Sequence, residues 1–266
     1  MNEQYSYTIE GSGPGLLLAH GAGGGIEANF GPLMADLRGT HTVVGPDLPG
    51  AGATPRSASP LDLDTVADTL VATAVGAGVE RFTVLGYSLG TAVAVRAATR
   101  HPDRVEGLVL TAGFARPDHR TRLTLGLWRE LLDGDRTLLA RFATLVAAGA
   151  PTLEALSTEE LTARLRAAEG FVPEGSPEQV DLAASVDTRD DLPRITVPTL
   201  VVATTLDRLV PPEASRELAE GIPGAEYAEV GSGHLIADEA PDAWLSLVRD
   251  FLDRHDRARV GGGRNG

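Results

Sequence analysis

Cysteine and lysine are both absent from this chain of 266 residues. The first absence excludes disulfides, thiolate metal sites and a cysteine nucleophile, and the second excludes a catalytic lysine. Apolar runs that reach the roughly 20 residues of a membrane-spanning helix are also missing. The opening residues, MNEQYSYTIE, have neither the basic start nor the apolar centre of a secretory signal. We therefore expect a soluble, cytoplasmic protein that does not bind membranes.

Positive charge is scarce as well. Against 37 acidic residues there are 23 basic ones, all arginine, and the formal net charge is −14. Such a surface repels phosphate backbones, so nucleic acid is not expected as a partner. Arginine without lysine, together with abundant alanine and glycine, indicates a GC-rich coding genome. With 42% hydrophobic residues the chain can bury a substantial core, and we expect a monomer or homodimer.

Short apolar runs bounded by turn residues alternate with segments of helical spacing. This alternation predicts an α/β fold with a mostly parallel central sheet flanked by helices. The predicted strands cover residues 15–19, 42–45, 82–85, 107–111, 198–204 and 226–230. The predicted helices cover residues 63–75, 91–99, 211–220 and 242–254.

The segment 116–191, here called the lid, has a different pattern. It contains leucines and aromatic residues at helical spacing and no strand-like run, so we expect several amphipathic helices inserted over the sheet. The sequence thus divides into a core, residues 1–115 and 192–257, and the lid, 116–191. The end of the chain, residues 258–266, is polar and rich in glycine and is predicted to be disordered.

Residues 86–90, Gly-Tyr-Ser-Leu-Gly, place a serine between two glycines, after a predicted strand and before a predicted helix. Glycines permit a sharp reversal of the chain, which lifts the Ser88 hydroxyl out of the sheet beside the N–H groups that open the helix. The alternative is a glycine-rich turn in which Ser88 only caps the helix. The strand and the helix on either side favour a nucleophile.

A serine hydroxyl needs a base that is oriented by a third group. Asp207 follows the predicted strand 198–204, and His234 follows the strand 226–230. The order serine, acid, histidine, with each residue after a strand, places all three at the carboxyl edge of one sheet. We therefore expect Ser88, Asp207 and His234 to form a catalytic triad.

Together these motifs resemble the α/β-hydrolase-fold serine hydrolases, and the resemblance extends over nearly the whole chain. It is carried by HGAGG at 20–24, DLPGAG at 47–52, GYSLG at 86–90, the Asp207 loop and GSGH at 231–234. The resemblance implies an oxyanion hole formed by the N–H groups of Ala22 and Leu89, with Gly23 as the alternative donor. It implies neither a cofactor nor a metal. Thr91 departs from the family pattern, which often has a further glycine there.

Other residues are weaker candidates for the same roles. His20, beside the oxyanion loop, is expected to be structural, because His234 already occupies the position of the base. Some family members place the acid after an earlier strand, which makes Asp118 an alternative to Asp207. His41, His101 and His255 lie in polar stretches and are predicted to be solvated.

The expected function is hydrolysis of an ester or lactone bond of a small apolar substrate through an acyl-enzyme, in bacterial secondary metabolism. A serine at the turn argues against the dehalogenase and epoxide hydrolase branches, which resemble this fold but use aspartate. A carbon–carbon bond hydrolase, lyase or cyclase remains an alternative, as does a non-hydrolytic binding protein. The lid is expected to select the substrate, and its candidate pocket residues are Leu127, Trp128, Leu131, Phe142 and Leu145.

Overall fold

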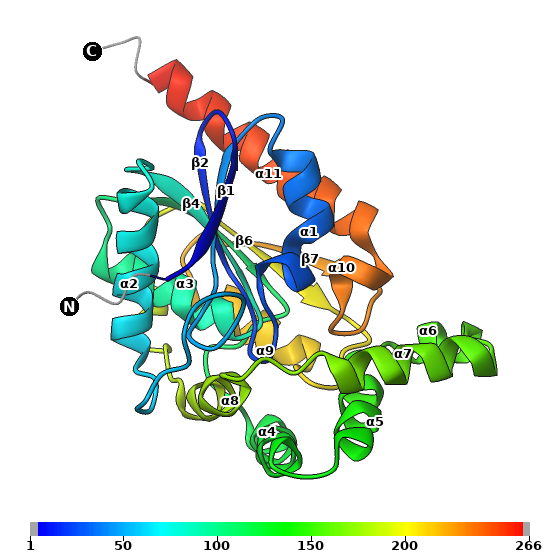
Figure 1. Cartoon of the computed structure of the whole chain (residues 1–266). Coiled ribbons are helices and arrows are strands. Elements are labelled where there is room, and N and C mark those ends of the chain that lie inside the picture. Colours follow the sequence, from blue (N-terminus) through cyan, green and yellow to red (C-terminus); the bar gives the residue numbers. More distant parts are fainter. Residues whose placement is uncertain (1–4, 263–266) are drawn as a thin grey trace.

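A seven-stranded sheet forms the centre of the molecule, with strand order β1-β3-β2-β4-β5-β6-β7 (Figure 1). The computed structural model describes residues 5–262. Only β1 is antiparallel to its neighbour, and every other pair of adjacent strands in this sheet is parallel. The predicted class of fold, a mostly parallel sheet flanked by helices, is confirmed. The strands are β1 Tyr7–Gly11, β2 Gly15–Ala19, β3 Thr42–Pro46, β4 Phe82–Tyr87, β5 Val105–Thr111, β6 Thr199–Thr204 and β7 Glu226–Val230.

Helices cover both faces of the sheet. Alternate residues of β2 belong to different cores: Leu17 packs with α2 and α3, whereas Leu16 packs with α1 and α11. These helices are α1 Ile26–Leu37, α2 Leu63–Gly76, α3 Leu89–Arg100, α9 Pro212–Gly221, α10 Ile236–Glu239 and α11 Pro241–Gly262. None of the helices within residues 5–262 is long and apolar enough to cross a membrane.

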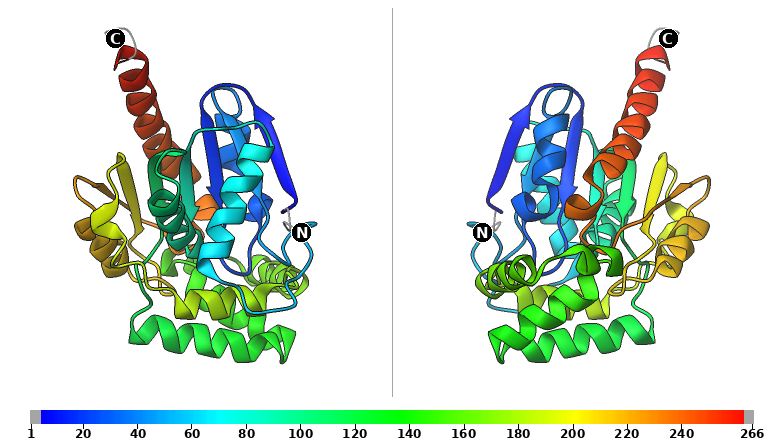
Figure 2. Two further views of the ribbon diagram at one scale, coloured as in Figure 1. Left: turned by 90° about the vertical axis from the view of Figure 1, so that its left-hand side faces the viewer. Right: turned by 90° about the vertical axis from the view of Figure 1, so that its right-hand side faces the viewer.

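Five helices lie between β5 and β6 in the chain, within the segment called the lid. They gather past one end of the sheet, on the side opposite the free end of α11 (Figures 1 and 2). They are α4 His119–Leu132, α5 Arg136–Ala147, α6 Ala150–Ala155, α7 Thr158–Gly170 and α8 Ser176–Ser185. Parallel strands whose carboxyl ends meet at one edge leave that edge open, and the lid helices lie across it.

Besides the short helix α10 and a 3₁₀ helix at Leu192–Arg194, two elements have no counterpart among the predicted ones. Strand β1 lies at the edge of the sheet and is mostly exposed, so it lacks the apolar run that marks a buried strand. Helix α1 contains Pro32 and begins after a run of glycines, which hides the helical spacing of its buried residues. Helix α11 continues to Gly262, into the range 258–266 for which the sequence predicts disorder. The rest of that range lies outside the described residues.

Candidate active site

Ser88 lies at the turn between β4 and α3 with φ of 55° and ψ of −121°, a backbone conformation that is unfavourable for residues other than glycine. The two flanking positions must be glycine, because backbone atoms of neighbouring segments lie too close to leave room for a Cβ atom. A Cβ on Gly86 would lie 2.4 Å from the carbonyl oxygen of Gly90, and one on Gly90 would lie 1.9 Å from that of Ala19. The two glycines therefore let the turn pack tightly enough to project the Ser88 side chain at the sheet edge.

Ser88, His234 and Asp207 form a continuous hydrogen-bonded chain. His234 Nδ1 lies 2.6 Å from Asp207 Oδ2, and His234 Nε2 lies 3.0 Å from Ser88 Oγ. Because a carboxylate only accepts hydrogen bonds, Nδ1 carries the proton and Nε2 is free to accept from the serine hydroxyl. All three residues are 5–8% exposed. This places the three predicted residues in the geometry that general-base activation of a serine requires.

The Asp207 carboxylate is held by its own loop. Its Oδ1 accepts the backbone N–H groups of Leu209 and Val210 at 2.8 and 2.9 Å. Its Oδ2, which faces His234, also accepts the hydroxyl of Thr204 at 2.9 Å. With these partners the carboxylate has little freedom to rotate, so the imidazole that it contacts is fixed in one tautomer and one orientation.

The His234 loop is held from both sides. Tyr87, beside the nucleophile, donates its hydroxyl to the His234 carbonyl at 2.5 Å, and the His234 N–H donates to the carbonyl of Ala147 in the lid at 2.7 Å. Burial raises the pKa of Tyr87 well above its usual value, so the phenol keeps the proton that it donates.

Glu239 adds a second connection between this loop and the lid. Its carboxylate accepts the N–H of Gly233 at 2.9 Å, the N–H of Gly149 at 3.0 Å and the hydroxyl of Thr152 at 3.0 Å. Gly233 precedes the histidine, and Gly149 lies between α5 and α6. One side chain therefore binds the histidine loop and the middle of the lid together.

The loop after β2 leaves the backbone N–H of Ala22 without a hydrogen bond among the described residues. The N–H of Gly21 donates to Asn29 Oδ1 at 3.0 Å, that of Gly23 to Gln179 Oε1 at 2.9 Å and that of Gly24 to the Gly21 carbonyl at 3.3 Å. Among the hydrogen bonds of the described residues, none uses the N–H of Ala22.

On the other side of Ser88, the N–H of Leu89 is likewise without a partner among residues 5–262. The two predicted donors, Ala22 and Leu89, are thus both available, whereas the N–H of the alternative, Gly23, is already engaged by Gln179.

His20 is fully buried in a structural position. Its Nδ1 lies 2.8 Å from the Gly21 carbonyl, and its Nε2 accepts the N–H of Leu48 at 2.9 Å. Burial lowers the pKa of His20, so the ring is neutral with its proton on Nδ1. Asp118, the alternative acid, instead accepts the Thr121 N–H at 2.6 Å and caps the start of α4.

The three histidines that the sequence predicts to be solvated, His41, His101 and His255, are less exposed than predicted. His41 is only 3% exposed, with Nε2 3.1 Å from Asp256. His101 and His255 are half-buried, and their Nε2 atoms lie 2.8 Å from Asp68 Oδ1 and 2.7 Å from the Glu106 carbonyl, respectively. Acidic or carbonyl partners that are distant in sequence bury these rings, which local polarity does not reveal.

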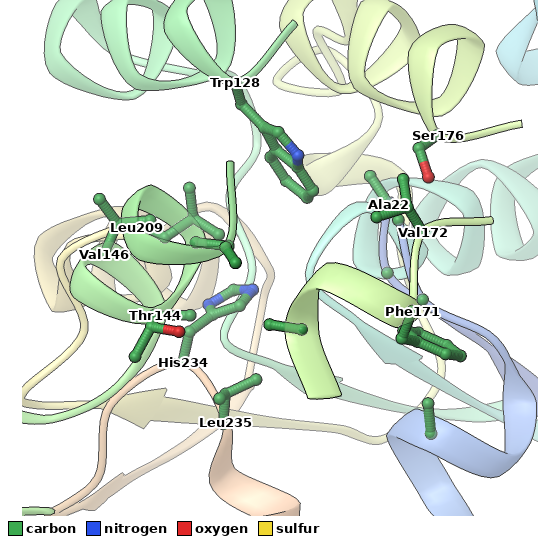
Figure 3. Close-up of a pocket in the computed structure, with 18 of the residues that line it drawn as sticks. Ala22, Trp128, Thr144, Val146, Phe171, Val172, Ser176, Leu209, His234 and Leu235 are labelled. Atoms are coloured by element: carbon green, nitrogen blue, oxygen red, sulfur yellow. The ribbon is translucent and has the colours of Figure 1, made fainter. Parts of the chain in front are cut away.

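A cavity of about 500 Å³ opens between Ser88 and the lid. Figure 3 shows Trp128 reaching from α4 into this cavity toward His234, with Phe171 and Val172 on another side. Its wall is mainly apolar, and Arg164 and Asp238 are the charged residues on it within the part of the chain that the structure describes. Apolar lining residues from the lid are Trp128, Leu132, Leu139, Ala140, Phe142, Ala143, Val146, Ala147, Ala167, Ala168, Phe171 and Val172.

Two of the five predicted pocket residues, Trp128 and Phe142, line the cavity, and the other three do not. Leu127 and Leu145 are 47% and 55% exposed, on the outer sides of α4 and α5, and Leu131 is half-buried outside the cavity. The reason for this correction is the helical register. Both helices carry apolar residues around much of their circumference, so periodicity alone does not say which face points inward.

The polar residues Gln179, Glu239 and Arg164 were not among the predicted site residues. Each lies in or beside a helix, in a stretch where polar residues ordinarily face solvent, and no local motif marks them. The positions of Gln179 and Glu239 depend on contacts with loops that are distant in sequence, Gln179 with Gly23 and Glu239 with Gly149.

A parallel sheet with a serine in a strained strand-to-helix turn, and with an acid and a histidine after later strands, defines the nucleophile-elbow class of fold. Comparison with known proteins agrees: residues 14–241 match the alpha/beta hydrolase fold family. The chain belongs to this family.

Three similar proteins illustrate the family. A pyrrolizixenacetamide deacetylase from Xenorhabdus hominickii is 36% identical over 258 residues, which cover 95% of this chain and 96% of the relative. A pimeloyl-(acyl-carrier protein) methyl ester esterase from Vibrio atlanticus is 30% identical over 274 residues, covering 96% and 100%. The crystal structure of the enol-lactonase from Burkholderia xenovorans LB400 has a TM-score of 0.82 at 25% identity, covering 93% and 96%.

Proposed function

We propose that the protein is a serine hydrolase that cleaves an ester or lactone bond of a small apolar substrate through Ser88, His234 and Asp207. The observation that carries this proposal is the hydrogen-bonded chain from Asp207 through His234 to Ser88, with distances of 2.6 and 3.0 Å. The similarity to an esterase and an enol-lactonase supports the same class of bond.

The geometry supports a two-step reaction. His234 Nε2 takes the hydroxyl proton as Ser88 Oγ attacks the substrate carbonyl, and the negative oxygen accepts the N–H groups of Ala22 and Leu89. His234 then gives its proton to the leaving alkoxide, which leaves an acyl group on Ser88. In the second step His234 removes a proton from water, the hydroxide attacks the acyl-enzyme, and the acid is released while the proton returns to Ser88.

The lid, residues 116–191, is proposed to act as the substrate-selecting unit, and residues 1–115 and 192–257 as the catalytic core. Trp128, Phe142 and Phe171 give the cavity an apolar wall opposite Ser88. This lining favours a substrate with a medium-sized apolar acyl or cyclic group. A place in bacterial secondary metabolism, expected from the composition, stays a prediction.

A second candidate is hydrolysis of an acetamide, because the deacetylase of Xenorhabdus hominickii is 36% identical over nearly the whole chain. The same residues serve both reactions, but an amine leaves less readily than an alkoxide and needs its proton from His234. A matched pair of substrates, an aryl acetate and the corresponding acetanilide, separates the two candidates by their ratio of kcat/KM.

Reaction with a fluorophosphonate tests the proposal. The unaltered protein is expected to gain one adduct on the peptide that contains Ser88, detected by mass spectrometry, and Ser88→Ala is expected to gain none. His234→Ala, folded as judged by circular dichroism, is expected to lose turnover of a p-nitrophenyl ester. Absence of the adduct on folded, unaltered protein refutes the activated serine and leaves a binding protein as the better explanation.

Adduct formation without turnover of esters, lactones or amides points instead to the alternative chemistries. A carbon–carbon bond hydrolase, lyase or cyclase retains an activated serine and ignores acyl–oxygen and acyl–nitrogen bonds. A panel that includes a vinylogous 1,5-diketone and a cyanohydrin therefore distinguishes these from the main proposal.

A further inference from the structure

Gln179 is a fully buried polar side chain that joins the lid to two loops of the sheet edge. It belongs to α8 and has an exposed fraction of 0%. Its Oε1 accepts the N–H of Gly23 at 2.9 Å, and its Nε2 donates to the carbonyl of Pro49 at 3.0 Å. These contacts span 156 and 130 residues of sequence. Both ends of the amide are thus used within the protein, on the loop that carries Ala22 and on the loop after β3.

The Gly23 hydrogen bond bears directly on which N–H faces the reacting oxygen. Gly23 has φ of 67°, and a Cβ there would lie 2.7 Å from Cζ2 of Trp128, so the loop is confined by its backbone conformation and by the lid. Gln179 turns the Gly23 N–H away from the reaction and toward α8. The neighbouring N–H, that of Ala22, has no hydrogen-bond partner among the described residues.

We propose that Gln179 is a positioning residue that sets the register of the oxyanion loop, so that Ala22 and not Gly23 donates to the tetrahedral intermediate. The proposal rests on the proposed function, because it assigns a role within the same acyl transfer. Loss of the Gln179 acceptor would leave the half-buried Gly23 N–H without its partner, and the loop would rotate to regain one. Such a rotation misplaces the Ala22 N–H, which matters most in the transition state.

A simpler role for Gln179 is to fasten α8 to the sheet, and the adjacent residue provides a control for that role. Glu178 also joins α8 to the segment after β3, through a two-pronged ion pair with Arg56 whose shortest distance is 2.7 Å. Among the described residues, the hydrogen bonds of the Glu178 side chain all go to Arg56, and none reaches the oxyanion loop. Substitutions at 178 and 179 therefore both weaken the attachment of α8, but only one frees Gly23.

The test compares Gln179→Met, which keeps the size of the side chain and removes both hydrogen bonds, with Glu178→Gln. For a p-nitrophenyl ester we expect kcat of Gln179→Met to fall about 10- to 100-fold with little change in KM, because one donor is displaced and not deleted. Glu178→Gln is expected to keep kcat within about twofold, since exposed ion pairs contribute little. Unfolding midpoints of both variants show how far each weakens the fold.

A trifluoromethyl ketone provides a readout that a purely structural role would not move. Ser88 Oγ adds to its carbonyl, His234 takes the hydroxyl proton, and the new oxyanion occupies the hole. The matching methyl ketone binds the same cavity and adds far less readily. Gln179→Met is expected to weaken the fluorinated inhibitor by about the same factor as kcat and to leave the methyl ketone unchanged.

Gln179→Glu keeps the test open if the methionine variant does not fold. Its ionised carboxylate accepts from Gly23 but cannot donate to Pro49, whereas the protonated carboxyl does both. Gln179→Lys is the reverse, because it can donate to Pro49 and cannot accept from Gly23, so kcat is expected to fall in this variant and not in Gln179→Glu. Equal kcat values in Gln179→Glu and Gln179→Lys overturn the proposal, as do values of kcat and inhibitor affinity in Gln179→Met that match those of Glu178→Gln.

Fluorophosphonate labelling of the unaltered protein separates this proposal from the proposed function. If Ser88 is labelled and the Gln179 variants behave like Glu178→Gln, only the role of Gln179 is wrong. If Ser88 of the folded, unaltered protein is not labelled, the proposed function is wrong and the role of Gln179 is overturned with it.

Discussion

The sheet and the lid are built in different ways. Every residue of β4 and β6 is buried, and the backbone of adjacent strands fixes their spacing. Helices α6 and α7 of the lid bury no residue fully, and Leu123 on α4 is 77% exposed. Besides buried apolar residues such as Leu125 and Val180, individual polar contacts made by Gln179 and Glu239 attach the lid to the sheet edge. Substitutions at the sheet edge should therefore affect chemistry and folding, whereas substitutions of the lid residues that form the cavity wall should affect the choice of substrate.

The largest difference is expected between two aspartates. Asp207→Asn removes the carboxylate that orients His234 and should lower kcat by about 10⁴. Asp118→Asn retains a good cap for α4 and should leave kcat within about twofold. Steady-state assays with a p-nitrophenyl ester measure both. A large loss in Asp118→Asn together with a small one in Asp207→Asn would move the acid from the end of β6 to the start of the lid.

Substitution of one glycine at the sheet edge and one in the lid compares how tightly the two regions are packed. Gly90→Ala places a Cβ 1.9 Å from the Ala19 carbonyl oxygen and should destabilise the fold by roughly 3 kcal/mol or more. A Cβ on Gly126, in α4, would meet nothing within 4 Å beyond its own helix backbone and chain neighbours, so Gly126→Ala should stabilise the fold by about 0.5–1 kcal/mol. Urea unfolding gives both values. Equal effects would mean that the sheet edge is looser than its contacts indicate.

Neighbouring lid residues divide into an inner and an outer face. Trp128→Ala enlarges the cavity and should raise KM for a bulky apolar ester by about 10-fold, which corresponds to about 1.4 kcal/mol of lost binding. Leu127→Ala changes an exposed side chain on the outer face and should leave KM within about twofold. Michaelis–Menten measurements with short and long acyl chains make the comparison. A larger effect at Leu127 would show that α4 turns when substrate binds.

The smallest expected effect depends on pH and belongs to His20. The folded pKa lies below the unfolded value of 6.5, so the unfolded chain binds a proton first as the pH falls. The stability that the neutral ring contributes is therefore complete above pH 6.5 and declines below it, by at most about 1.4 kcal/mol per pH unit. Urea midpoints between pH 8 and 5.5 measure the slope. His20→Asn should show a shallower slope, and an unchanged slope would mean that other groups cause it.

The strands at the centre of the sheet could be predicted because they are buried on both faces and appear as continuous apolar runs. The proximity of Ser88, Asp207 and His234 could be predicted because each follows a predicted strand of one parallel sheet, although β7, before His234, is a mostly exposed edge strand. Strand β1 and helix α1 could not, since exposure in one and Gly and Pro in the other remove the apolar signal.

The inner face of the lid could not be predicted either. Leu138 and Leu139 are equally apolar, yet the first is 51% exposed and the second lines the cavity. Which of them faces inward depends on how α5 rotates against the sheet edge, and this is decided by tertiary contacts. The role of Thr91, which departs from the family pattern, also needs the structure: its hydroxyl donates to the Ser88 carbonyl at 2.7 Å beneath the turn.

Glu239 makes the lid and the histidine loop a single cooperative unit. The N–H groups of Gly149 and Gly233 share its carboxylate, and the His234 N–H adds a bond to Ala147. Opening either segment breaks hydrogen bonds of the other, so the amides of Gly149 and Gly233 should exchange with deuterium at similar rates. On warming, enzymatic activity and the attachment of the lid should then disappear in the same transition, before the sheet itself melts.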